Sequence, residues 1–70
     1  MELTINKNTK INGKKVKDIN WHSHTLILFV TRGNENIIPN GNFILQEDDS
    51  IIIMTKEDSI RKIEKMVSEK

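Results

Sequence analysis

Two histidines flank a serine at His22-Ser23-His24, and this is the short motif with the most reactive side chains in the chain. If the segment is extended, residues i and i+2 point to the same side, so His22 and His24 could share a metal ion. No cysteine or nearby carboxylate completes a ligand set, and a solvated loop is the ordinary alternative. Ser23 beside His24 could form a nucleophile pair, but exposed loops contain many such neighbours. We therefore predict neither a metal site nor a catalytic site.

Two runs of like charge could bind ions. One is acidic: Glu47, Asp48 and Asp49. Three successive carboxylates cannot all face one divalent cation, and the spacing of an EF-hand is absent, so we interpret this run as a charged turn. The other is basic: Lys14, Lys15 and Lys17. These lysines could contact phosphate or a membrane surface, although a solvated face is the usual role of such residues.

Trp21 is the only tryptophan in the chain. It could be a binding platform, but a buried or dimer-facing anchor is the favoured role, because tryptophan contributes strongly to interface energy. Gly33 and Gly41 are isolated glycines of the kind found in turns, and no glycine-rich phosphate loop is present.

The length and composition of the chain exclude several classes of protein. We expect a single domain over residues 1–70, because 70 residues are too few for two. The chain has no cysteine, which excludes disulfides and thiol chemistry. Its 11 basic and 10 acidic residues nearly balance, which argues against nucleic acid as a partner. No apolar run is long enough to span a membrane, and no secretory signal is visible.

The hydrophobic pattern predicts a mainly antiparallel sheet with two helical segments. We expect extended segments at Glu2–Ile5, Leu26–Val30, Glu35–Ile38, Phe43–Leu45 and Ser50–Thr55, and a short helix within Lys14–Ile19. Thr55 is a good N-cap for a C-terminal helix, and Asp58 could complete a capping box. The apolar stripe of this helix is Ile60, Ile63, Met66 and Val67.

The fold class that follows is α+β, and it implies a partner surface. Leu26–Val30 and Ser50–Thr55 contain continuous apolar runs, as in strands that are buried on both faces. The two helices can cover only one face of the sheet. A small chain without disulfides is also near the margin of stability. A symmetric second copy is the simplest way to cover the other face, so we predict a homodimer.

The order of these segments resembles the TrkA-C domain, also called the RCK C-terminal domain, over about residues 2 to 67. The matching features are a Gly-led short helix, an apolar strand ending in Arg-Gly, a short strand to Pro, and a Leu and an Asp before a second apolar strand. They fall here at Gly13, Val16, Ile19, Leu26 to Val30, Arg32, Gly33, Pro39, Leu45, Asp49 and Ile51 to Ile53. One departure is Asp48, which stands where the family usually has Gly. Asp tolerates a positive φ better than most residues, so we expect the turn to survive.

The resemblance implies a dimeric regulatory domain on the cytoplasmic side of the cell membrane, in the same chain as a membrane-spanning channel or transporter or bound to one. The stretch from Asn20 to Asn40 looks most like the versions attached to ClC-type chloride channels. The alternatives are a potassium uptake system, a cation–proton antiporter, or a free-standing adaptor that binds no small ligand. A small enzyme is the least favoured class.

The resemblance also implies a small anionic or nucleotide ligand at the dimer interface, whose identity the sequence leaves unknown. We expect its contacts among residues near two strand ends: Trp21, His22, Arg32, Asn36 and Ile37. Some potassium-transport members hold cyclic di-AMP with an Asp-Ile-Arg turn. This chain has Asn20-Trp21-His22 around that place and no Arg, so we expect weak or absent binding of cyclic di-AMP. Arg32 could instead pair within its own chain, with Glu35 across the turn.

Overall fold

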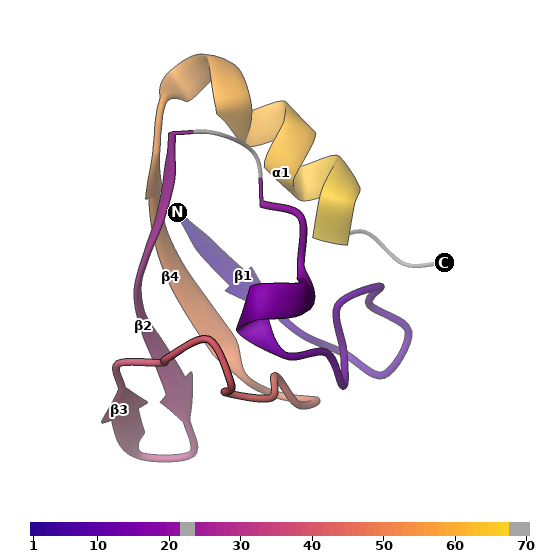
Figure 1. Cartoon of the computed structure of the whole chain (residues 1–70), viewed down its shortest axis with the longest axis vertical. Helices are drawn as coiled ribbons and strands as arrows, with labels where there is room; N and C mark the ends of the chain where they lie inside the picture. Colours follow the sequence, from indigo (N-terminus) through magenta and orange to yellow (C-terminus); the bar gives the residue numbers. More distant parts are fainter. Residues whose placement is uncertain (22–23, 68–70) are drawn as a thin grey trace.

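The computed structural model describes residues 1–21 and 24–67 and shows an α+β fold with seven elements (Figure 1). Four are strands: β1 (Glu2–Thr4), β2 (Thr25–Arg32), β3 (Glu35–Ile37) and β4 (Ser50–Thr55). Three are helical: the 3-10 turns η1 (Val16–Asp18) and η2 (Glu57–Ser59), and the helix α1 (Ile60–Val67). The predicted fold class is therefore confirmed. The motif His22-Ser23-His24 lies partly outside the described residues, so its proposed geometry is not described.

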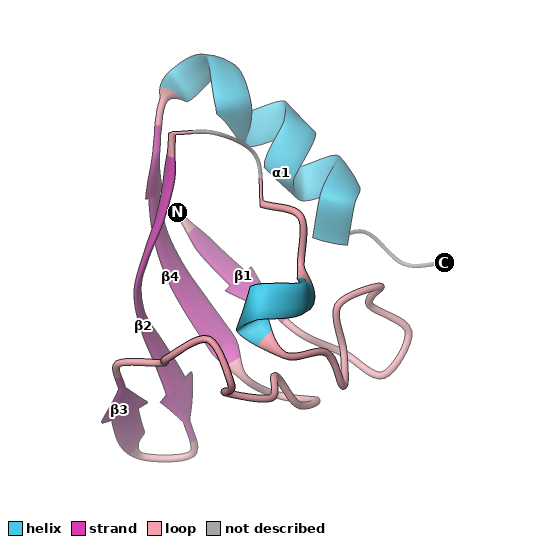
Figure 2. Cartoon of the chain, in the orientation of Figure 1, coloured by secondary structure: helices cyan, strands magenta, loops and turns pink. Residues whose placement is uncertain are grey.

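The four strands form one antiparallel sheet in the order β1-β4-β2-β3 (Figure 2). The central pair is β2 with β4, in which Thr25 lies opposite Thr55 and Val30 opposite Ile51. The register shifts between Ile27 and Phe29, as at a β-bulge. A tight turn at Gly33, with a φ of +60°, connects β2 to β3. Glycine tolerates this left-handed conformation without steric cost.

The core lies against one face of the sheet. Its buried apolar side chains are Ile5, Ile11, Ile19, Val30, Leu45, Ile51, Ile53 and Ile63. Ile51 and Ile53 alternate along β4 with less buried residues, which is the period-two pattern of a strand with one covered face. Ile63 comes from α1, and Figure 1 shows α1 and η1 on the same side of the sheet. One chain therefore covers one face only.

The opposite face, which we call the outer face, carries exposed apolar residues. Leu26 and Met54 lie opposite each other in the sheet and are 58% and 59% exposed, and Leu28 is 36% exposed. The strands are thus not buried on both faces within a single chain. The described residues provide no second layer for the outer face, because their helical segments are packed on the other side (Figure 1).

The expected N-cap of the C-terminal helix is wrong. Thr55 is still part of β4, where it pairs with Thr25, and its hydroxyl is buried without a hydrogen-bond partner. The N-cap position falls one residue later, at Lys56, which has extended backbone dihedrals. The chain instead enters a 3-10 turn after Lys56, whose side chain makes no capping bond, and becomes α-helical at Ile60.

β1 and β3 each end one residue before the predicted bound, and two further segments are less regular than expected. The helix predicted within Lys14–Ile19 is a single 3-10 turn, Val16–Asp18. The segment Phe43–Leu45 forms no strand, and only one isolated bridge joins Lys15 to Ile44. Hydrogen bonds from Val16 N to the Phe43 carbonyl and from Leu45 N to the Lys14 carbonyl hold the two segments together. In the part of the chain that the structure describes, no helix could span a bilayer.

Candidate functional site

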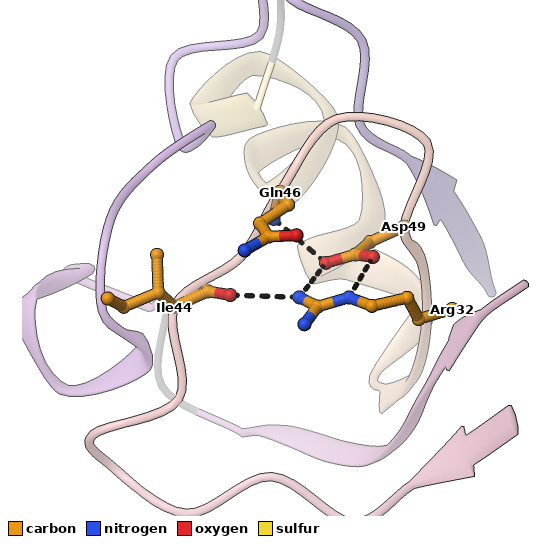
Figure 3. A network of polar contacts seen from close by, with 4 residues as sticks. All are labelled: Arg32, Ile44, Gln46 and Asp49. Carbon is orange, nitrogen blue, oxygen red and sulfur yellow. Dashed lines mark hydrogen bonds and ion pairs between the residues drawn. The ribbon is translucent and has the colours of Figure 1, made fainter.

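A polar cluster centred on a bidentate ion pair joins the end of β2 to the turn that precedes β4 (Figure 3). Its centre is the ion pair between Arg32, the last residue of β2, and Asp49, the residue before β4. Arg32 Nε donates to Asp49 Oδ1 at 2.8 Å, and a terminal guanidinium nitrogen donates to Oδ2 at 2.7 Å. This bidentate geometry is the strongest form of an arginine–carboxylate pair.

Further contacts occupy both members of this pair. The same terminal nitrogen of Arg32 donates to the Ile44 carbonyl at 3.0 Å, and Gln46 N donates to Asp49 Oδ2 at 2.8 Å. The guanidinium also lies 4.7 Å from the centre of the Phe43 ring, within the range of a cation–π contact. One arginine therefore fixes the position of the whole segment from Phe43 to Asp49.

The environment of the pair shifts both pKa values. The hydrogen bond from Arg32 holds the pKa of the Asp49 carboxyl below its ordinary value; burial opposes this effect, and the Gln46 N–H adds to it. The hydrogen bond to Asp49 raises the pKa of Arg32. Asp49 is 1% exposed and Arg32 34% exposed, so the pair bridges the core and the surface. Both groups stay charged at neutral pH, and the cluster is structural rather than catalytic.

Arg32 does pair within its own chain, but its partner differs from the expected one. Glu35 lies opposite Arg32 in the β2–β3 hairpin and is exposed, whereas Asp49 is buried. A buried carboxylate is costly without a cationic partner, while an exposed one is hydrated by water. The arginine therefore stabilises the fold most by pairing with Asp49.

The acidic run forms a turn, as expected. Asp48 has a φ of +73°, the left-handed conformation expected where the family has Gly. Its backbone N–H donates to the Ile5 carbonyl at 2.7 Å, and Ile5 N donates to the Asp49 carbonyl at 2.9 Å. Among the described residues, no group of three histidines or carboxylates could hold a metal ion.

The expected ligand-binding residues are divided between the two ends of β2. Asn36 and Ile37 belong to β3, beside Arg32, and the Asn36 amide oxygen accepts a hydrogen bond from the Thr31 hydroxyl at 3.0 Å. Trp21 precedes the other end of β2, packs partly buried against the core, and leaves its buried indole N–H without a partner. At ~3.3 Å per residue, β2 itself is roughly 20 Å long, and Arg32 lies at the end far from the one that Trp21 precedes. We expected Trp21 to lie beside Arg32 and Asn36 within one chain, and the structure instead places it before the opposite end of β2. His22 lies outside the described residues.

A shallow pocket at the first end of β2 was not foreseen. It has a volume of about 520 Å³ and is lined by His24, Thr25, Leu26, Met54, Thr55 and Lys56. Leu26 and Met54 connect it to the outer face. No local motif indicated it, because its two walls are 28 residues apart and meet only through the pairing of Leu26 with Met54.

The other feature that sequence reasoning missed is the coupling of Arg32 to Asp49. Arg32 and Asp49 each match the family pattern, which does not itself pair them. The signal in the sequence is that one charged residue ends a predicted apolar strand and the other directly precedes a second one.

Comparisons with known proteins agree with this architecture. The family described as "TrkA-C domain" matches residues 1–68. A Trk system potassium uptake protein TrkA homolog of Methanosarcina mazei is 34% identical over 65 residues, and one of Archaeoglobus fulgidus is 35% identical over 60. These alignments cover 93% and 86% of this chain but only 14% of each relative.

Two solved structures share the fold. One is described as an RCK domain with "cda"; it has a TM-score of 0.80 at 17% identity, and the match covers 97% of this chain and 96% of that one. The other is the RCK_C domain dimer of S. agalactiae BusR in complex with c-di-AMP, with a TM-score of 0.78 at 17% identity and coverage of 94% and 91%.

Proposed function

Because the chain belongs to the TrkA-C domain family, we propose that it is the cytoplasmic regulatory domain of a Trk-type potassium-uptake system. The family is regulatory and not enzymatic, which agrees with a polar cluster whose groups are all engaged in structural bonds. The chain spans about a seventh of the length of the potassium-uptake relatives, so transport itself would belong to other parts of the system.

The comparisons favour potassium uptake over the ClC-type chloride channel that the stretch from Asn20 to Asn40 had suggested. The relatives of M. mazei and A. fulgidus are potassium-uptake proteins, and each alignment includes most of this chain. Nothing in them supports a chloride channel. A potassium uptake system, which was an alternative to the chloride channel, is therefore the better supported assignment.

The family match carries the assignment to potassium uptake, and the uncovered outer face carries the proposed dimer. Leu26, Leu28 and Met54 expose apolar area on a sheet whose other face is fully packed. Large apolar patches on small domains mark surfaces that bind a partner. A second copy is the simplest occupant, and the BusR structure of the same fold is a dimer.

Dimerisation provides a mechanism for regulation. A ligand at the interface that prefers one dimer geometry shifts the transporter between states by its difference in affinity, typically ~1–3 kcal/mol. The proposed contacts of the ligand are Trp21, His22, Arg32, Asn36 and Ile37. Among the described residues, Trp21 precedes the start of β2, whereas Arg32, Asn36 and Ile37 lie at its other end. A small ligand could therefore reach both groups only if a two-fold axis placed the start of one β2 near the end of the other.

Sedimentation equilibrium at micromolar concentration tests the dimer, and the expected mass is about twice that of the chain. Met54→Lys places a charge on the outer face and should yield a folded monomer or weaken association at least tenfold. Glu64→Lys introduces the same side chain at an exposed position of α1 and should leave the dimer unchanged. A monomeric wild type, or equal effects of the two variants, would contradict the proposal.

A further inference from the structure

Five lysines lie in the segment of residues 7–17, which we call the lysine loop: Lys7, Lys10, Lys14, Lys15 and Lys17. No acidic residue occurs in this segment. The whole chain has a net charge of +1, so the residues outside the loop together carry −4. Positive charge is therefore concentrated in this part of the sequence, although Asp18 follows Lys17 directly and the total charge is nearly zero.

The backbone of the lysine loop is held in place by buried anchors. Ile11 is in the core, and Thr9 is buried, with a hydroxyl that accepts from Asn6 N and donates to the Asn6 side chain. The Asn12 side chain donates to the Lys7 carbonyl at 3.3 Å. The loop is thus ordered before any partner arrives, so binding would carry a small entropic cost.

All five lysine side chains are exposed, and none forms an ion pair with a described residue. From Gly13 to Lys17 the backbone bonds to a segment without charge, residues 40–46. The carboxylates of Glu47 and Asp48 belong to a turn that bonds to Ile5, next to the start of the loop. The positive charge of Lys10, Lys14 and Lys15 is therefore not neutralised by a contacting partner.

The lysine loop and the outer face are separate surfaces. Figure 1 shows the segment between β1 and η1 on the side of the sheet that carries α1, whereas Leu26 and Met54 belong to the opposite face. A dimer formed through the outer face would leave the lysines accessible.

We propose that the lysine loop docks the domain on anionic lipid headgroups of the membrane. This inference rests on the proposed function, which keeps the domain beside a bilayer. Lysine side chains act as point charges suited to a diffuse anionic surface. The loop contains neither arginine nor an aromatic residue, the side chains that stack on bases and hold nucleic acid strands, so lipid is favoured over nucleic acid.

Vesicle flotation of the whole chain tests the proposal. The protein should float with vesicles that contain phosphatidylglycerol and not with vesicles of phosphatidylcholine alone, and high salt should release it. The variant Lys10→Gln/Lys14→Gln/Lys15→Gln should weaken partitioning roughly a hundredfold, at about fivefold per lysine. A matched control, Lys56→Gln/Arg61→Gln/Lys62→Gln, removes the same charge elsewhere and should bind at least ten times better than the loop variant.

Three results would overturn the inference: no binding to anionic vesicles, equal losses in both triple variants, or displacement from vesicles by a small excess of single-stranded RNA. Circular dichroism of both variants separates loss of binding from loss of fold. A dimer that fails to bind vesicles would refute membrane docking and leave the regulatory function standing.

Discussion

Arg32 and Asp49 join the end of β2 to the start of β4 by two parallel hydrogen bonds of 2.8 and 2.7 Å. Since Arg32 also bonds the Ile44 carbonyl, this pair sets the path of the long connection between β3 and β4, which contains no regular strand.

Asp49→Asn should destabilise the fold by about 2–3 kcal/mol, because it leaves the guanidinium without its charged partner. The loss should fall below that of a fully buried pair, since Arg32 is 34% exposed. Arg32→Lys should also destabilise, because an ammonium cannot form the bidentate contact. Urea unfolding measures both. Glu47→Gln, in the exposed part of the same turn, is the control and should change stability by less than about 0.5 kcal/mol.

The pair should also make stability depend on acid pH. The pKa of Asp49 is lower in the folded chain than its ordinary value of about 3.9, so its contribution is complete above that value and is lost as the pH falls toward the folded pKa. As the pH falls below about 4, the free energy of unfolding of the wild type should decrease more steeply than that of Asp49→Asn. Thermal melts across this range measure the difference. Parallel pH profiles of the two proteins would contradict the assigned role of Asp49.

Asp48→Gly should stabilise the fold by up to ~1 kcal/mol. The residue has a φ of +73°, and relief of this strain outweighs the extra entropy that glycine adds to the unfolded chain. Glu47→Gly is the matched control: Glu47 has no positive φ, so glycine there should destabilise by about 0.5–1 kcal/mol. The melting temperatures of the wild type, Asp48→Gly and Glu47→Gly measure these differences in stability. Clear destabilisation by Asp48→Gly would reveal a role of the Asp48 side chain.

Thr55→Val should stabilise the fold by about 1 kcal/mol. The Thr55 hydroxyl is buried without a partner, and valine keeps the shape of the side chain while removing the unsatisfied group. Thr31→Val is the comparison, because the Thr31 hydroxyl donates to Asn36 at 3.0 Å; this change should be neutral or destabilising. The midpoints of denaturant unfolding measure both changes in stability. Equal shifts for the two variants would argue against a destabilising effect of the unbonded Thr55 hydroxyl.

Cyclic di-AMP should bind weakly or not at all. The Asp-Ile-Arg turn of the resembling potassium-transport members is interrupted here, because Asp18-Ile19 is followed by Asn20. Titration calorimetry with cyclic di-AMP, ATP and simple anions tests this expectation, and Asn20→Arg, which restores the turn, should raise the affinity for cyclic di-AMP at least tenfold. Sub-micromolar binding by the wild type, lost in Arg32→Ala while that variant remains folded, would show that the departure has no effect.

The amino-acid sequence by itself determined the elements whose signal is local. The continuous apolar run from Ile51 to Met54 predicted β4 with the correct bounds, because a short apolar run and its flanking turn residues act within a few positions. The resemblance placed Asp48 where the family usually has Gly, and the positive φ found there agrees with that position. The family resemblance rested on the same kind of information, the order and spacing of such elements.

Tertiary structure decided which of these elements meet. The choice of Asp49 over Glu35 as the partner of Arg32 depends on which carboxylate is buried, and only the packed chain determines burial. Thr55 looked like a helix cap, but pairing with Thr25 keeps it in the sheet, because a ladder between distant segments outweighs a local capping preference. The exposed outer face has the same origin: its apolar residues are visible in the sequence, but only the placement of α1 and η1 shows which side they leave uncovered.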